Sequence, residues 1–213
     1  EVLLILGLIA IISMSTVAIY QNNVKRLLAY SSVAQVGYMV IGISMLTITG
    51  LTATILHLFN HAIIKGALFL SLAAVFYRIK SVKVEDMAGL GKSMPYTMAA
   101  FVAAGFSLIG VPSTFGFISK WYLILGALEK DWWLVAVLIV LSSLLAVIYF
   151  WKVIESAYFK PRPDGATENK EAPLSMLVSI WVLVGSNFYF GINTNFTISI
   201  ATKAANSLIG TSP

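Results

Sequence analysis

Residues 51–77 have the sequence LTATILHLFNHAIIKGALFLSLAAVFY, an apolar run that contains two histidines and one lysine. About 20 consecutive apolar residues are enough for an α-helix to cross the hydrocarbon core of a bilayer, so this run can span a membrane. A lysine at the centre of such a helix costs at least ~2.5–3.5 kcal/mol on insertion scales, and it must therefore face a partner or water. The stretch predicts a membrane helix that carries buried polar chemistry.

The composition of the whole chain also favours a membrane protein. Of its 213 residues, 59% are hydrophobic and only 11% are charged, and the mean hydropathy is +0.89. Soluble domains carry about 25% charged residues, so this chain cannot cover a water-facing surface. The net charge of +5 comes from basic residues between apolar runs, which fits membrane-protein loops better than a nucleic-acid-binding face. The absence of cysteine from the sequence excludes disulfide scaffolds and thiolate sites.

Six apolar runs predict the fold class: an all-α, polytopic transmembrane helix bundle of about six spans. Glu1 is followed at once by an apolar run, without an initiator Met or a charged segment typical of a signal peptide, so we expect a piece of a longer protein. The predicted spans cover about 2–20, 27–47, 52–77, 95–128, 132–158 and 173–192.

The run 95–128 is too long for one plain crossing, and it contains the sequence IGVPSTFG at 109–116. Proline removes a backbone donor and clashes with the preceding turn, while glycines lower the cost of unwinding. We therefore expect one discontinuous helix, broken near Gly110 and Pro112, with Gly116 just beyond the break. A broken helix at membrane depth commonly marks an ion or substrate path, and a plain proline kink is the alternative.

The basic residues predict the orientation of the bundle. If each run crosses once, ten basic side chains fall on one side and two on the other, so the positive-inside rule places the loops near 21–26, 78–94 and 159–172 in the cytoplasm. Two full crossings by 95–128 would destroy this asymmetry, and we therefore expect a single crossing. The ten are Lys25, Arg26, Arg78, Lys80, Lys83, Lys92, Lys152, Lys160, Arg162 and Lys170; the two are Lys130 and Lys203.

The spacing of His57, His61 and Lys65 places them on one helical stripe about 12 Å long, with Asn60 beside it. Imidazole titrates near neutral pH, and it can accept a hydrogen bond on one nitrogen while donating from the other. A desolvated lysine can gain and lose its proton in the same pH range. The stripe therefore predicts a proton relay. Lys120, beyond the expected break, is the second lysine inside a span.

Several of these polar residues also fit purely structural or metal-binding roles. A single buried histidine is usually a hydrogen-bonded core residue, and a single lysine can snorkel to an interface. The His-x-x-x-His spacing can bind zinc, but Leu58 stands where the metalloprotease motif needs glutamate, and we expect no metal. Ser31, Gln35 and Tyr38 can line a wet path or serve only as hydrogen-bond partners between helices. The sequence contains no nucleotide or redox-cofactor motif, so we expect no cofactor.

With these residues identified, the sequence resembles the antiporter-like membrane subunits of complex I and of Mrp cation/proton antiporters. The matching segments together cover about 24–125 and are specific in combination. Three further segments, SKWYL at 119–123, EAPLSML at 171–177 and YFGI at 189–192, are most similar to the C-terminal half of the Mrp antiporter D subunit. The segments that carry the broader resemblance are VKRLLAYSSVAQVGY (24–38), HLFNHAIIKGALFL (57–70), MAGLGKSMP (87–95) and LIGVPSTFGFISK (108–120).

The resemblance implies the second half of an inverted-repeat transporter fold in the bacterial inner (plasma) membrane. It implies a second five-helix repeat at 1–158, a cytoplasmic loop at 159–172, and an additional spanning helix with a C-terminal tail at 173–213. It further implies that His57, His61 and Lys65 belong to a central polar axis. Lys120, next to Ser119, would then stand at the exit half-channel.

Three hypotheses of function follow. The leading one is a proton-translocating subunit of a multisubunit Na⁺/H⁺ antiporter, with protons and Na⁺ as substrates, other membrane subunits and the lipid bilayer as partners, and no nucleic acid. The first alternative is a proton-pumping subunit of a complex I-like NADH–quinone oxidoreductase or a membrane-bound hydrogenase, in which the chain belongs to an enzyme without performing its catalysis. The second alternative is a structural membrane scaffold with no active path.

Overall fold

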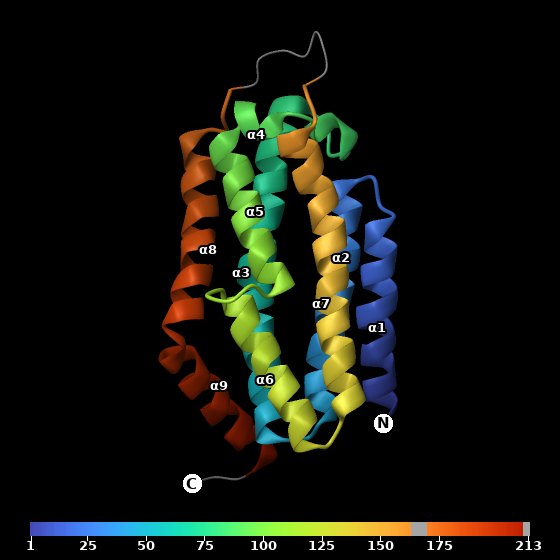
Figure 1. Ribbon diagram of the computed structural model, residues 1–213. Coiled ribbons are helices and arrows are strands. Elements are labelled where there is room, and N and C mark those ends of the chain that lie inside the picture. The colour runs from blue at the N-terminus through green and yellow to red at the C-terminus, as the bar shows by residue number, and fades with distance from the viewer. Residues whose placement is uncertain (163–169, 211–213) are drawn as a thin grey trace.

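The computed structural model describes residues 1–162 and 170–210, and all regular elements in that part of the chain are helices. Figure 1 shows the long helices standing side by side as an upright bundle. Within the described residues, five helices are long and apolar enough to cross a membrane. They are α1 (Val2–Ile19), α2 (Val24–Ser44), α3 (Ile48–Ile79), α7 (Trp133–Ile154), which continues into a π-helical turn (Glu155–Phe159), and α8 (Leu174–Ile192).

The sixth crossing is made by two shorter helices, α5 (Pro95–Ile109) and α6 (Phe115–Glu129). They follow one another in the same direction through the bundle, joined by a short irregular link near its middle (Figure 1). Gly110 lies in the left-handed region at φ 96°, which an L-residue rarely adopts, and Ser113 follows at φ 70°. The expected all-α bundle with one discontinuous helix broken near Gly110 and Pro112 is therefore confirmed.

Helix boundaries differ from the predicted spans where capping residues, not hydrophobicity, decide them. The Asn23 side chain accepts a hydrogen bond from the backbone N–H of Arg26, so α2 begins earlier than position 27. Thr47 caps α3 in the same way, and α3 ends at the left-handed Lys80. These caps are polar residues at or beyond the ends of the apolar runs, and a hydropathy pattern does not register them.

The structure also contains helices that the sequence did not predict. A 3₁₀ turn (Glu85–Met87) and the short helix α4 (Leu90–Ser93) lie between α3 and α5. The segment after α8, expected to be a C-terminal tail, forms α9 (Thr194–Ile209), which packs against α3. Parts of the predicted loop 159–172 and of the tail, at 163–169 and 211–213, lie outside the described residues.

Helix α3 is the centre of the bundle, because it packs against α2, α5, α6, α8 and α9. Its buried face contributes Leu68 and Leu72 to the main core, where they join Met98 and Phe101 of α5. Helix α7 closes the other side by packing on α1, α5 and α6. The stripe predicted on α3 is therefore enclosed by protein on several sides.

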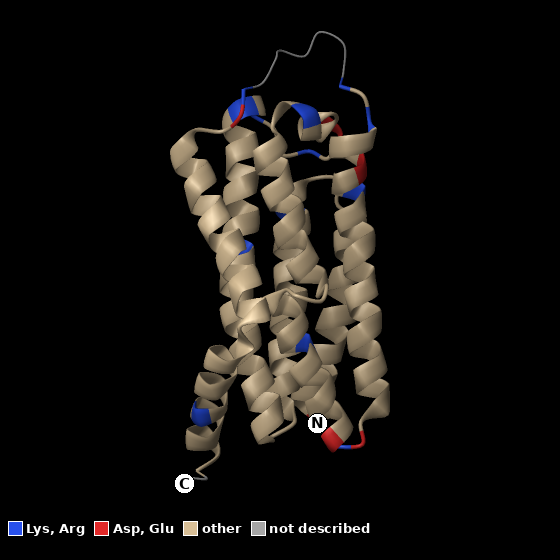
Figure 2. Cartoon of the chain, turned by 60° about the vertical axis from the view of Figure 1, so that its left-hand side comes forward, with Lys and Arg blue, Asp and Glu red and all other residues tan. Residues whose placement is uncertain are grey.

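The chain reversals that carry most basic residues meet at one end of the bundle. Figure 2 shows that the blue parts of the ribbon, which mark Lys and Arg, gather at that end and are few at the other. There, Lys152 donates hydrogen bonds to the Gln21 carbonyl oxygen at 3.2 Å and to the Asn22 side chain at 2.6 Å, which ties α7 to the α1–α2 turn. Residues Asn23 and Lys83 form an antiparallel bridge that joins this turn to the segment after α3. We call this end of the bundle, which contains the α1–α2 turn, Lys83 and Lys152, the basic end.

The single crossing by α5 and α6 predicts that Lys83 and Lys130 lie on opposite sides of the membrane. Residues 1–213 contain no cysteine, so Lys83→Cys and Lys130→Cys each introduce one labelling site in this stretch, in a background from which any cysteine elsewhere in the subunit is removed. In membrane vesicles of defined orientation, an impermeant maleimide should label the two variants from opposite faces. Leu68→Cys is the control, because Leu68 is fully buried and should label from neither face. Labelling of both surface positions from the same face would contradict the single crossing.

Candidate functional site

The polar stripe on α3 lies where the sequence placed it. Lys65 is only 6% exposed, and His57 and Asn60 are buried as well. His61 is half-buried between them, with electrostatic interactions to His57 on one side and to Lys65 on the other. The stripe therefore forms one series of polar groups through the middle of the bundle.

The Lys65 amine is held by α2. Its Nζ donates hydrogen bonds to the Leu28 carbonyl oxygen at 2.8 Å and to the Ser31 hydroxyl at 2.5 Å. Ser31 in turn donates to the same Leu28 carbonyl at 2.9 Å. An ammonium has three donors, so these two acceptors leave one N–H of a protonated Lys65 for another partner.

The His57 ring connects α2 to α6. Its Nε2 lies 3.0 Å from the Gln35 Oε1, and its Nδ1 lies 2.9 Å from the Ser119 hydroxyl. Ser119 also lies 3.1 Å from the Gly116 carbonyl oxygen, to which it can donate. If Nε2 donates to Gln35, a neutral ring accepts from Ser119, whereas a protonated ring donates to Ser119, which then turns to Gly116. The hydrogen-bond partners of His57 are therefore compatible with both a neutral and a protonated ring.

Lys120 lies at the helix break and closes the end of α5. Its Nζ donates to the carbonyl oxygens of Leu108 and Ile109, each at 2.9 Å, and to the Ser143 hydroxyl at 3.0 Å. In a continuous helix the Leu108 carbonyl would accept from residue 112, but Pro112 has no N–H. Lys120 therefore supplies the donors that the break removes, at the helix end whose dipole favours a cation.

The two half-helices complete each other's hydrogen bonds. While Lys120 of α6 binds the last carbonyls of α5, Ser107 of α5 accepts a hydrogen bond from the Gly116 backbone N–H at 3.0 Å, in the first turn of α6. A Cβ on Gly116 would lie 1.8 Å from the Ser107 carbonyl oxygen, so only glycine allows this approach. Close packing is the role that the structure gives to Gly116.

A second polar group ties the break to α3 and α8. The Asn60 side-chain oxygen accepts from the Asn187 amide at 3.0 Å and from Ser107 at 3.4 Å. All three residues are buried. An unpaired polar group in hydrocarbon costs several kcal/mol, so this cluster favours one relative placement of α3, α5 and α8.

The predicted site residues thus form two groups in the structure. One group, at the break, contains His57, Gln35, Tyr38, Ser119 and Lys120; the Tyr38 ring lies 5.4 Å from the His57 ring and 5.1 Å from the Lys120 Nζ. The other group contains Lys65 and Ser31. His61 lies between the two groups on α3, and the Asn60 cluster lies beside them.

The sequence analysis did not single out four buried or half-buried polar residues that belong to this network: Ser107, Ser143, Tyr149 and Asn187. Each stands inside an apolar run, and that position is the signal that could have found them. Their partners are far away in the chain, so the sequence alone did not connect them to the stripe.

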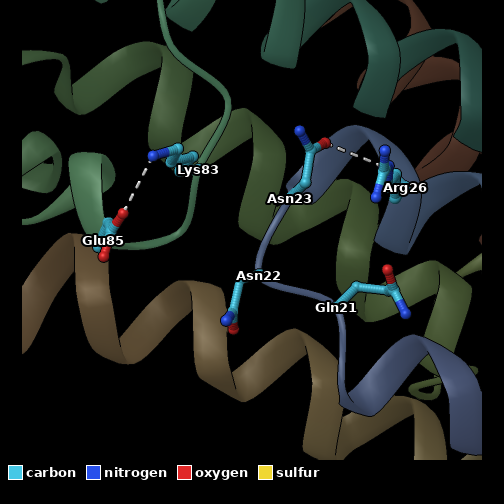
Figure 3. Close-up of a pocket in the computed structure, with 6 residues that line it drawn as sticks. All are labelled: Gln21, Asn22, Asn23, Arg26, Lys83 and Glu85. Atoms are coloured by element: carbon cyan, nitrogen blue, oxygen red, sulfur yellow. Dashed lines mark hydrogen bonds and ion pairs between the residues drawn. The ribbon is translucent and has the colours of Figure 1, made fainter.

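The basic end carries a separate surface pocket of about 450 Å³ (Figure 3). It lies between the α1–α2 turn and the segment after α3, and an exposed ion pair joins Lys83 to Glu85 at 3.5 Å. The pocket is lined by Gln21, Asn22, Asn23, Arg26, Lys83 and Glu85. None of these residues belongs to the buried network. In the described part of the chain, no group of three or more His, Asp or Glu side chains gathers in a way that could hold a metal ion.

Comparisons with a family model and with individual known proteins agree on one family. A family model described as "NADH:quinone oxidoreductase/Mrp antiporter, TM" matches residues 1–146. The chain is 46% identical, over 79% of its length, to the NADH-quinone oxidoreductase subunit N of Desulforudis audaxviator. It is 32% identical, over 95% of its length, to the F(420)H(2) dehydrogenase subunit N of Methanosarcina mazei. It spans 36% and 43%, respectively, of the lengths of these two relatives.

A solved structure shares the fold. A chain of the Mrp complex from Dietzia sp. DQ12-45-1b superposes with a TM-score of 0.92 at 23% identity, over 98% of this chain and 47% of that one. At this identity the likeness establishes the fold alone.

The packing of α8 against the break generates a prediction with a control on the same helix. A Cβ on Gly191 would lie 2.4 Å from the Thr114 carbonyl carbon, whereas a Cβ on Gly185 meets no atom within 4 Å. Gly191→Ala should therefore push α8 off the link and destabilise the protein by about 1–3 kcal/mol, the usual cost of overpacking. Gly185→Ala should leave stability unchanged. Thermal unfolding of the purified complex measures both, and equal midpoints for the two variants would contradict the close approach.

Proposed function

Because the chain belongs to the family of NADH:quinone oxidoreductase and Mrp antiporter membrane subunits, we propose that it is part of a proton-translocating membrane subunit of a multisubunit complex. Protons move between Lys65 and Lys120 through the interior of the bundle. One connection follows α3 from Lys65 through His61 and His57 to Ser119 and Lys120. Residues 1–158 act as the second repeat of the subunit, and 173–213 add a further spanning helix and a C-terminal segment.

The observation that carries this proposal is that, within the described residues, the acceptors of both buried lysines are neutral. Lys65 and Lys120 are each 6% exposed, and an ion pair between Lys83 and Glu85 lies away from both, at the surface. A carboxylate beside a lysine would favour the charged form of the amine and oppose its deprotonation. Here each amine contacts a serine hydroxyl, Ser31 or Ser143, which can accept from an ammonium or donate to a neutral amine. Such surroundings suit a group that changes its protonation state.

The free energy required to move a proton against the membrane potential is modest. Moving one elementary charge across 100 mV is worth about 2.3 kcal/mol, and one pKa unit corresponds to about 1.4 kcal/mol. A change of under two pKa units in a carrier during turnover therefore offsets the membrane potential. Rearranged hydrogen bonds at Ser31 or Ser143, or a change in the charge of the other lysine, are sufficient sources of such a change.

By the positive-inside rule, the basic end lies on the cytoplasmic side of a bacterial inner membrane. Lys120 lies past the break, in the half of the bundle away from that end, which supports an exit role on the outer side. The partners in this proposal are the other membrane subunits of the complex.

Two kinds of complex fit the subunit. Two of the sequence relatives, an NADH-quinone oxidoreductase subunit N and an F(420)H(2) dehydrogenase subunit N, favour proton pumping driven by redox chemistry elsewhere in the complex. The segments around 119–123 and 171–177, which resemble the Mrp antiporter D subunit, favour Na⁺/H⁺ antiport. Both use the same buried lysines and differ in what drives the protons.

The driving force separates these two candidates in membrane vesicles that contain the complete complex. A redox-driven pump should build a pH gradient only when NADH or another electron donor reduces quinone or its equivalent. An antiporter should dissipate an imposed pH gradient on addition of Na⁺, with no electron donor. Fluorescence quenching by a pH-sensitive amine dye measures both. Na⁺-dependent dissipation without redox turnover would contradict the pump, and strict dependence on the donor would contradict the antiporter.

The lysines themselves test the proposal against a structural scaffold. Lys65→Met removes a carrier, and Lys120→Arg keeps the charge and the donors to Leu108 and Ile109 but hardly ever deprotonates. Each variant should assemble normally and lose proton transport by about 100-fold or more, the typical worth of a positioned proton carrier. Lys203→Met, at an exposed position of α9, is the control and should behave as the wild type. Full transport with Lys120→Arg would support the scaffold instead.

A further inference from the structure

Tyr149 of α7 is a buried polar side chain that the connection along α3 does not use. It is 0% exposed, and its hydroxyl has no hydrogen-bond partner among the residues that the structure describes. Buried hydroxyl groups in proteins almost always have a partner, either in the protein or in a bound water molecule. We therefore expect a bound water molecule to be the hydrogen-bond partner of the Tyr149 hydroxyl.

The groups that face the Tyr149 hydroxyl link it to Lys65. The Ser31 hydroxyl lies close to it without completing a hydrogen bond, and the Tyr38 phenol interacts with it electrostatically; both residues are on α2. Ser31 accepts the hydrogen bond from the Lys65 Nζ. One serine side chain therefore separates Tyr149 from the first buried lysine.

Tyr38 continues the series toward the second lysine. Its hydroxyl interacts with Ser142 and Ser143, which precede Tyr149 on α7 by about two turns. Ser143 binds the Lys120 Nζ at 3.0 Å, and the Tyr38 ring lies 5.1 Å from the same nitrogen. The polar groups Ser31, Tyr149, Tyr38 and Ser143 thus run from Lys65 to Lys120 without passing through a histidine.

We propose that the Tyr149 hydroxyl, bridged by a bound water molecule to Ser31 and Tyr38, completes a second proton connection from Lys65 to Lys120 along α2 and α7. This inference rests on the proposed function and adds a route to it. Each hydroxyl or water on the route accepts a proton from the Lys65 side and gives up its own toward Lys120. On each group, one O–H bond forms as another breaks, so the number of protons on the route stays the same. The hydroxyl groups and the water then rotate back to their starting orientations.

Two parallel routes have a kinetic signature that a structural role lacks. Removal of one route leaves the other, so a single block lowers transport only in part. Removal of both stops transport, so the effect of one substitution grows when the other is present. A tyrosine that only fills space lowers transport by the same factor in either background.

The test uses Tyr149→Phe, which removes only the hydroxyl, in the complete complex, with and without His57→Ala. Proton transport in membrane vesicles should fall about twofold for Tyr149→Phe alone and at least about tenfold when it is added to His57→Ala. Tyr158→Phe, at an exposed position beyond the end of α7, is the matched control and should have no effect in either background. Tyr38→Phe, on the same route, should repeat the pattern of Tyr149→Phe and serves if the latter fails to assemble.

Tyr149→Phe lowers transport by one factor in the wild type and by another in His57→Ala. The proposal is overturned if these two factors differ by less than about threefold, because independent sites scatter by less than that. Complete loss of transport in His57→Ala alone would also overturn it, because no parallel route would then remain. These outcomes are distinct from failure of the proposed function itself. That failure would appear as full transport in Lys65→Met and Lys120→Arg, the positions that both routes share.

Discussion

The hydrogen bonds from Lys120 to the Leu108 and Ile109 carbonyl oxygens are the interaction on which the site depends. A helix break in the middle of a membrane leaves backbone acceptors that lipid cannot satisfy. A lysine in the same place is a charge that lipid cannot solvate. Each feature is unfavourable alone, and each supplies what the other lacks. Pro112 makes the unmet acceptor at Leu108 permanent, and so gives the ammonium a fixed place at the centre of the bundle.

The surrounding helices are arranged around this pair. Ser107 and Gly116 hold the two half-helices together, and the Asn60–Asn187 contact fixes α3 and α8 against them. The lysines are not locked by carboxylates, because hydroxyl groups complete their contacts. A rigid backbone therefore surrounds side chains whose hydrogen bonds can reverse direction. That combination is what proton transfer requires, and it explains how a chain with few charged residues in its spans can carry acid–base chemistry.

The sequence predicted the spans, the broken helix and the α3 stripe, because each depends on a local pattern: hydrophobic length, a Gly–Pro pair, or spacing of four residues. It did not predict α9, whose polar composition hides a helix that is stabilised by packing on α3. It also missed Ser143 and Tyr149, since nothing local connects α7 to Lys120 or Ser31. Lys120 was predicted as a buried lysine near the break, but its role in closing α5 depends on the conformation of the link, which lets its side chain reach back to the last carbonyls of α5. The family resemblance stated from the motifs is confirmed, whereas the roles of individual residues stay predictions.

The central claim is that the amine at position 120 takes up and releases the transported proton at the helix break. Replacement of Lys120 by thialysine, through an expanded genetic code, tests it most directly. Thialysine keeps the length and the donors of lysine, but its sulfur withdraws electrons and makes the amine a weaker base. The account predicts that the complete complex still transports protons, with the pH dependence of transport displaced toward lower pH. Full transport with an unchanged pH dependence would contradict it, because the basicity of residue 120 would then have no part in the transfer.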